Sequence, residues 1–198
     1  ARRVSSWRAT RSLDDELRAQ GIVGISGVDT RALTRHLREN GAMRVGIFSA
    51  DQAQAPVDQL IARVRAVPDM LGASFTDTVT TERTYVVPAV GPQRFQVAAV
   101  DLGIKSMTPH LMAQRGIEVH VVPADISAAD LLEVGRDGIF VSNGPGDPAT
   151  ATHAVALVTA ALEAKRPFFG ICFGNQILGR ALGFGTYKLR YGHRGINQ

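Results

Sequence analysis

A single cysteine lies between two glycines in the run Gly170-Ile-Cys-Phe-Gly174. The apolar and small residues 168–171 predict the end of a buried strand. Apolar residues at helical spacing then predict a helix: Ile177, Leu178, Ala181 and Leu182. A nucleophile on such a sharp turn needs neighbours without Cβ, and a helix N-terminus favours a thiolate. The pattern therefore predicts a nucleophile elbow, with Cys172 in the place of the usual serine.

A lone cysteine after an apolar strand is more often a small buried hydrophobic residue than a nucleophile. The paired glycines and the strand–turn–helix context favour the nucleophile here. One cysteine in the whole chain also excludes internal disulfides and metal sites built from several cysteines. We therefore expect no metal in this chain.

A second stretch with chemical potential is Ser142-Asn-Gly-Pro-Gly-Asp-Pro148, which follows a predicted strand. Two glycines and two prolines make its backbone rigid, and the N–H groups of Gly144 and Gly146 can be aimed at a ligand. Taken alone, the stretch suits an ordinary turn. Beside a nucleophile elbow it suits an oxyanion hole, whose other donor would be the N–H of Phe173.

The elements that must position these residues alternate between strand and helix. Strands are predicted at 95–100, 117–122, 138–141 and just before Cys172, and helices at about 106–114, 127–132 and after Pro148. This rhythm predicts the α/β class, with a doubly wound, mostly parallel sheet. Ligands of such sheets bind at the carboxyl ends of the strands, where both stretches fall.

The first part of the chain predicts a smaller α/β domain. Helices are predicted at 12–20, 28–40 and 56–67, and strands at 22–25 and 44–48. Ser, Thr, Pro and Gly accumulate over 72–94, which indicates a linker. We therefore assign residues 1–90 to part of an N-terminal domain with its linker, and residues 95–198 to the domain that carries Cys172.

The composition limits the classes of partner. The 198 residues carry a net charge of +4, and 45% of them are hydrophobic, so a core can form. The arginines of the first 50 residues are scattered, which favours a solvated surface over a nucleic-acid site. No apolar run approaches the ~18 residues of a membrane span, and no secretory leader is visible. We expect a cytoplasmic protein with neither a nucleic-acid nor a membrane partner.

Several motifs resemble a known family. Residues 170–176, Gly-Ile-Cys-Phe-Gly-Asn-Gln, resemble the nucleophile motif of class I glutamine amidotransferases, and 142–148 resemble their oxyanion-side loop. Residues 27–35 with 41–43, and Tyr191-Gly-His-Arg-Gly-Ile-Asn-Gln198, are similar to small subunits of carbamoyl-phosphate synthases. The resemblance runs over the whole chain.

The resemblance implies a reaction and a partner. The subunit would hydrolyse glutamine to glutamate and ammonia, and the ammonia would pass through a tunnel to a large subunit. There, bicarbonate and two ATP would yield carbamoyl phosphate for arginine and pyrimidine biosynthesis. No cofactor is implied in this chain, while ATP and Mg²⁺ are implied for the large-subunit partner.

The resemblance also assigns site residues. Cys172 matches the nucleophile that forms a γ-glutamyl thioester. Gly144 and Phe173 match the oxyanion-side donors, and Gly146 and Gln176 match positions that contact the substrate glutamine. Many members carry Leu and His where this chain has Phe173 and Asn175. The catalytic His and its Glu partner are implied beyond Gln198, and a substrate-contacting Ser is implied ahead of residue 1.

The chain's own histidines are His36, His110, His120, His153 and His193. We expect each to be structural or exposed, with His193 the best placed to act as a base. The 198 residues alone are accordingly expected to have negligible glutaminase activity. Two alternatives remain: a non-catalytic fragment or paralogue that only binds the large subunit, and another cysteine hydrolase, which the Asp29-Thr-Arg helix disfavours.

Overall fold

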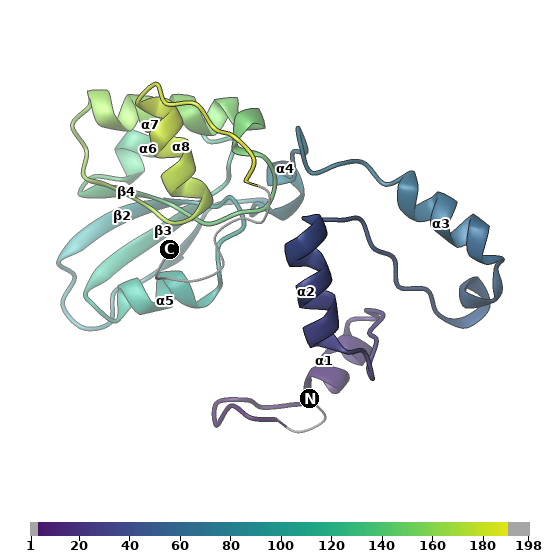
Figure 1. Cartoon of the computed structure of the whole chain (residues 1–198). Helices are drawn as coiled ribbons and strands as arrows, with labels where there is room; N and C mark the ends of the chain where they lie inside the picture. The colour runs from purple at the N-terminus through teal and green to yellow at the C-terminus, as the bar shows by residue number, and fades with distance from the viewer. Residues whose placement is uncertain (1–3, 190–198) are drawn as a thin grey trace. The chain divides into compact units, whose positions relative to one another are not determined.

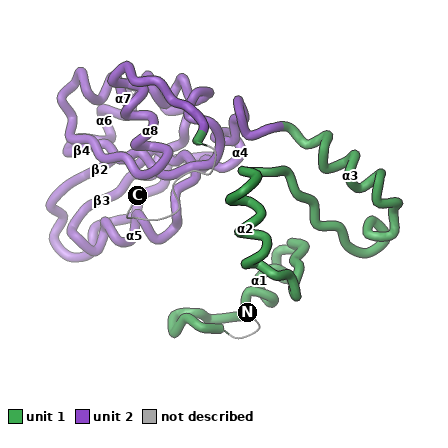
Figure 2. The backbone as a smooth tube through the Cα atoms, in the orientation of Figure 1, with its two compact units in different colours: residues 1–68, 189–198 green, residues 69–188 purple. Residues whose placement is uncertain are grey.

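The computed structural model describes residues 4–189, and the chain divides into two compact units. The first unit comprises residues 1–68 with 189–198, and the second comprises residues 69–188 (Figure 2). The segment over 72–94, predicted to be a linker, lies within the second unit. Each unit is described by itself below.

The described part of the first unit is helical. It contains α1 (Leu13–Ala19), α2 (Thr30–Asn40), a 3₁₀-helix η1 (Ala50–Gln54) and α3 (Val57–Arg65). Ser12 caps α1 by accepting a hydrogen bond from the N–H of Asp15, and Asp29 caps α2 by accepting one from the N–H of Ala32. The three α-helices were predicted from these caps and from the spacing of their apolar residues.

The two strands predicted in this unit are wrong. Residues 22–25 and 44–48 have no regular secondary structure and form no ladder with another described segment. Most of their large apolar side chains are exposed, for example Ile25 and Val45. An extended apolar run becomes a strand only when a neighbour satisfies its backbone N–H and C=O groups. No such neighbour stands beside these runs within the described residues.

The second unit is built on a five-stranded sheet (Figure 1). Its strands are β1 (Tyr85–Val87), β2 (Phe95–Val100), β3 (Ile117–Val122), β4 (Gly138–Val141) and β5 (Phe168–Gly170), in the order β1-β3-β2-β4-β5. Strands β2 to β5 are parallel, and β1 runs antiparallel to β3. The α/β class and the mostly parallel sheet are confirmed. β1 was missed, because it lies in the stretch whose prolines and glycines indicated a linker.

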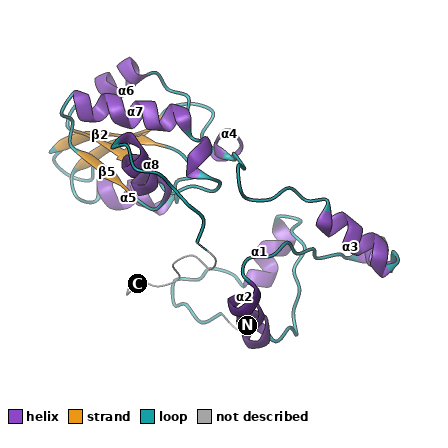
Figure 3. Cartoon of the chain, turned by 45° about the horizontal axis from the view of Figure 1, so that its top comes forward, coloured by secondary structure: helices purple, strands orange, loops and turns teal. Residues whose placement is uncertain are grey.

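Helices cover both faces of the sheet (Figure 3). On one face lie α6 (Ala128–Val134), α7 (Thr152–Glu163) and α8 (Phe173–Ala181), which bury alternate strand residues such as Val100 and Val141. On the other face, α5 (Met107–Ala113) packs near a smaller cluster that contains Val121 and Phe140. Strands buried on both faces explain the near-continuous apolar runs of the sequence.

Three strands end at the same level. Val100 of β2 is paired with Val141 of β4, and Val141 is paired with Gly170 of β5. The residues that follow these three positions therefore meet at one edge of the sheet. This register places Cys172 beside the loop that begins at Ser142.

Candidate active site

Cys172 has the backbone geometry of a nucleophile elbow. It follows β5, it is the N-cap of α8, and its φ of 54° and ψ of −108° lie in a region that non-glycine residues rarely adopt. Such a conformation costs about 1–3 kcal/mol and persists only where the surrounding structure enforces it. The side chain is exposed rather than packed in the core. The buried-hydrophobe interpretation therefore fails.

Both flanking glycines are required by close backbone contacts. A Cβ on Gly170 would lie 2.6 Å from the carbonyl carbon of Gly174. A Cβ on Gly174 would lie 2.2 Å from the carbonyl oxygen of Val141, the last residue of β4. The N–H of Gly174 donates to the Ser142 carbonyl over 3.1 Å, so the start of α8 is bonded to the start of the second stretch. The elbow is thus locked against β4 through main-chain atoms.

The loop over 142–148 is held from the other side by the residues after β2. The hydroxyl of the fully buried Ser142 accepts a 2.9 Å hydrogen bond from the N–H of Leu102. The Asn143 side chain donates to the carbonyl of Gly103 over 2.8 Å. A Cβ on Gly144 would lie 2.1 Å from the Leu102 carbonyl oxygen, so only glycine fits there.

Backbone donors are available at both predicted oxyanion positions. Phe173 is the first residue of α8, so its N–H has no partner within the helix. Within residues 4–189, the N–H groups of Phe173 and Gly144 donate to no other group. The Phe173 side chain packs into the core, so any contact of this residue with a substrate would come from its main chain.

The two residues predicted to contact glutamine lie in the first turn of α8 and in the loop over 142–148. Gln176 is exposed on α8, and its N–H donates to the Cys172 carbonyl over 3.1 Å. Gly146 has a φ of +106°, a left-handed conformation that favours glycine. A Cβ there would lie 3.0 Å from the carbonyl oxygen of Ala73.

Two buried carboxylates at this edge were not singled out from the sequence. Asp101 follows β2 and accepts hydrogen bonds from the N–H groups of Gly103 and Ile104, each at 2.8 Å.

The second carboxylate, Asp147, lies near the end of the loop over 142–148 and is only 3% exposed. The N–H groups of Gly72 and Ala149, followed by Lys188, hold the pKa of Asp147 below its ordinary value. Its place directly after the two loop glycines was the available signal.

Among the described residues, no hydrogen bond joins a histidine ring to the Cys172 thiol. The ring of His120 contacts Glu118 at 2.8 Å, that of His153 contacts the Ile126 carbonyl at 3.0 Å, and that of His36 faces Asn40. His193 lies outside the described residues, as does the rest of the Tyr191–Gln198 motif.

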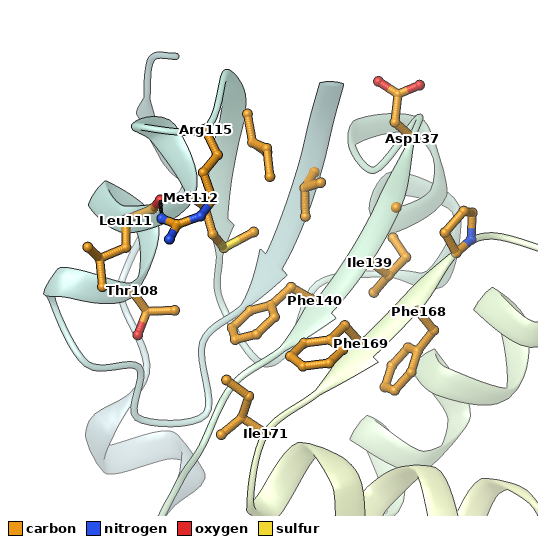
Figure 4. Close-up of a pocket in the computed structure, with 14 residues that line it drawn as sticks. Thr108, Leu111, Met112, Arg115, Asp137, Ile139, Phe140, Phe168, Phe169 and Ile171 are labelled. Atoms are coloured by element: carbon orange, nitrogen blue, oxygen red, sulfur yellow. Dashed lines mark hydrogen bonds between the residues drawn. The ribbon is translucent and has the colours of Figure 1, made fainter. Parts of the chain in front are cut away.

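An apolar groove of about 720 Å³ lies between α5 and the strands β4 and β5 (Figure 4). Phe140 and Phe169 stack along it with ring centroids 6.3 Å apart. Its charged residues, Arg115 and Asp137, offer no nucleophile. The groove therefore lacks the chemistry that the strand ends provide, and Cys172 is not among the residues that line it.

Other classes of site find no support in the part of the chain that the structure describes. No cluster of three or more His, Cys, Asp or Glu side chains there could hold a metal ion. No helix among residues 4–189 combines the length and the apolar character that a membrane crossing requires.

Comparison with known proteins identifies the family. The model of glutamine amidotransferase class-I matches residues 98–198, which include the elbow and the loop over 142–148. The chain belongs to this family. The model of the carbamoyl-phosphate synthase small chain, CPSase domain, matches residues 1–47. Both matches confirm the resemblance that the motifs indicated.

Curated relatives agree with both matches. The carbamoyl phosphate synthase small chains of Streptomyces avermitilis and Streptomyces coelicolor are 67% and 65% identical over 198 residues, which is 100% of this chain. That of Corynebacterium diphtheriae is 56% identical over 194 residues, or 98% of this chain. The chain spans about half the length of these relatives, 51–52% of each.

Proposed function

We propose that this chain is the part of a glutamine-hydrolysing carbamoyl-phosphate synthase small subunit that carries the nucleophile and the oxyanion-side loop. The observation that carries the proposal is the left-handed backbone of Cys172 at the turn from β5 into α8. Strained, exposed side chains on such turns serve covalent chemistry rather than packing. The names of the relatives supply the reaction in which that chemistry would be used.

In the proposed reaction, the Cys172 thiolate attacks the side-chain amide carbon of glutamine. The N–H groups of Phe173 and Gly144 stabilise the oxyanion that forms. Collapse of the intermediate breaks the C–N bond, and the nitrogen leaves as ammonia once it has been protonated. Water then hydrolyses the thioester, which releases glutamate and restores the thiol.

The proton transfers require a base, which we assign to a His–Glu pair in the half of the protein that this chain does not span. The ammonia passes to a large subunit, where ATP with Mg²⁺ drives the synthesis of carbamoyl phosphate. We place this reaction in the cytoplasm, where a free thiol stays reduced.

Cys172→Ser in the complete small subunit, assembled with the large subunit, tests the proposal. Serine has nearly the same volume but is almost wholly protonated at neutral pH. We expect glutamine-dependent carbamoyl phosphate synthesis to fall at least about a thousandfold. Synthesis from added ammonia should be largely unchanged, because added ammonia bypasses the hydrolysis of glutamine that the substitution blocks. Cys172→Ala, which has no hydroxyl, should give the same split.

Two results would contradict this assignment. If both activities vanish while the complex stays assembled, Cys172 has a structural role or is coupled to the synthetase. If glutamine-dependent synthesis survives both substitutions, Cys172 is not the nucleophile, and the catalytic role proposed for this chain is refuted.

A further inference from the structure

A segment near the start of the second unit crosses the edge where the parallel strands end. We call residues 72–81 the strap; they include the short helix α4 (Thr76–Val79). At its far end, the Thr80 hydroxyl accepts a 2.9 Å hydrogen bond from the N–H of Ala124, in the loop after β3. The N–H of Thr81 donates to the buried carboxylate of Asp101, after β2, over 3.0 Å. The strap is thus fixed to two of the strand-end loops.

At its near end, the strap is fixed to the loop over 142–148 by a reciprocal pair of hydrogen bonds. The N–H of Gly72 donates to Oδ2 of Asp147 over 2.9 Å. The N–H of Asp147 donates in return to the Ala73 carbonyl, also over 2.9 Å. The same carbonyl oxygen lies against Gly146. The position of Gly146 is therefore set by a backbone segment about 75 residues earlier in the chain.

The second oxygen of Asp147 has a separate, local role. Oδ1 accepts a 3.0 Å hydrogen bond from the N–H of Ala149 and so caps the 3₁₀-helix η2 (Pro148–Thr150). Lys188 Nζ lies 3.4 Å from the same oxygen, but its side chain is half exposed, so this pair contributes little. A cap needs one acceptor, whereas the structure uses both oxygens of a buried carboxylate.

We propose that Asp147 is a positioning residue: its Oδ2 holds the strap and thereby fixes the backbone of Gly144 and Gly146 for glutamine. This inference rests on the proposed function. The loop is held on one side by the residues after β2 and at its end by the strap. Without the hydrogen bond from the Gly72 N–H to Oδ2, only the bond from the Asp147 N–H to the Ala73 carbonyl holds this end of the strap. The carbonyl against which Gly146 lies is then less firmly placed. The loop over 142–148 then samples other conformations, and the free energy needed to order it weakens the binding of glutamine.

Asp147→Asn in the complete small subunit, assembled with the large subunit, separates the two roles. Asparagine is as good a cap as aspartate, but it has a single acceptor oxygen and presents an NH₂ group to the second N–H. We expect the KM for glutamine to rise roughly tenfold, the size expected for the loss of one charge-assisted hydrogen bond. The ammonia-dependent rate should stay within about twofold of wild type, well below the tenfold effect.

Two further variants separate the effect of the Gly72 hydrogen bond from that of the helix cap. Asp147→Ser also keeps a cap acceptor and lacks the second oxygen, so it should repeat the rise in KM. Ser127→Ala removes the cap of α6 by taking away the acceptor for the Asp130 N–H. Ser127→Ala should lower the Tm as the loss of a helix cap does, but it should not raise the KM for glutamine. Hydrogen exchange should show faster exchange of the Gly72 amide in both Asp147 variants.

The outcomes are distinguishable. If the KM for glutamine is unchanged in the Asp147 variants, or rises equally in Ser127→Ala, the positioning role is refuted. It is also refuted if neither Asp147 variant assembles, because the side chain is then needed for folding. If the wild-type complex makes no carbamoyl phosphate from glutamine, the proposed function fails, whatever Asp147 does.

Discussion

Gly174→Ala should destabilise the protein even though alanine is the better helix former. The backbone of Gly174 is helical, and the substitution alone would gain up to about 1 kcal/mol. The new Cβ would lie 2.2 Å from the Val141 carbonyl oxygen and 2.8 Å from its carbon, both main-chain atoms. Carbon and oxygen in contact are ordinarily about 3.3 Å apart or more, so α8 and the end of β4 must separate by about 1 Å.

The magnitude follows from three contributions. Overpacking costs about 1–3 kcal/mol. The Gly174 N–H donates to the carbonyls of both Ile171, at 3.0 Å, and Ser142, at 3.1 Å, and weakening of the second bond costs up to about 1 kcal/mol more. With the gain in helix propensity subtracted, we expect a net loss of about 1–3 kcal/mol, which lowers the Tm by about 2–10 °C.

The matched control is Gly179→Ala in the same helix. A Cβ on Gly179 meets no atom within 4 Å, so only the gain in helix propensity remains. Thermal unfolding of the complete protein should show a small rise in Tm for Gly179→Ala and a fall for Gly174→Ala. Glutamine-dependent activity should fall only in Gly174→Ala. Equal stability of the two variants, with activity retained, would refute the account of a backbone-locked elbow.

Two further predictions concern single side chains. A glutamine analogue with an electrophile at the γ-position should label Cys172 faster in the folded protein than in the unfolded chain. Mass spectrometry of the peptide that contains Cys172 measures both rates. Equal rates would count against an activated thiol. Because the pKa of Asp147 is lowered by folding, its ionised form stabilises the protein above about pH 4, the ordinary range of an aspartate. The stability advantage of wild type over Asp147→Asn in urea unfolding should therefore shrink as the pH falls from 6 to 3, and an advantage that grows would contradict the assignment.

The sequence predicted the second unit well because its signals are local. The runs at Phe95–Val100 and Ile117–Val122 are mostly apolar, and the structure has strands with these bounds. The cap at Ser127 is likewise encoded within four residues. The elbow was predicted for the same reason, since the close approach of Gly170 to Gly174 depends on neighbours in sequence.

Predictions failed where the deciding partner was distant. The runs at 22–25 and 44–48 have the composition of strands but no ladder within the described residues. β1 was missed because its pairing with β3 outweighs the prolines and glycines around it. Asp147 was passed over because the N–H group that donates to its Oδ2 lies 75 residues away. Its place after the loop glycines marks the residue but does not encode that contact.

When the groups that bind the substrate belong to the main chain, their positions depend on residues that do not contact the substrate. The proposed oxyanion donors are main-chain N–H groups, and only a substitution by proline removes such a group at its own position. What can change is the anchorage of that main chain by Ser142, Asp101 and Asp147, each buried and each accepting backbone hydrogen bonds. Loss of an anchor leaves the nucleophile in place and misplaces the donors, so it should raise the barrier to attack on the amide without unfolding the sheet. Substitutions at these three residues should therefore separate glutamine use from stability more cleanly than substitutions in the core.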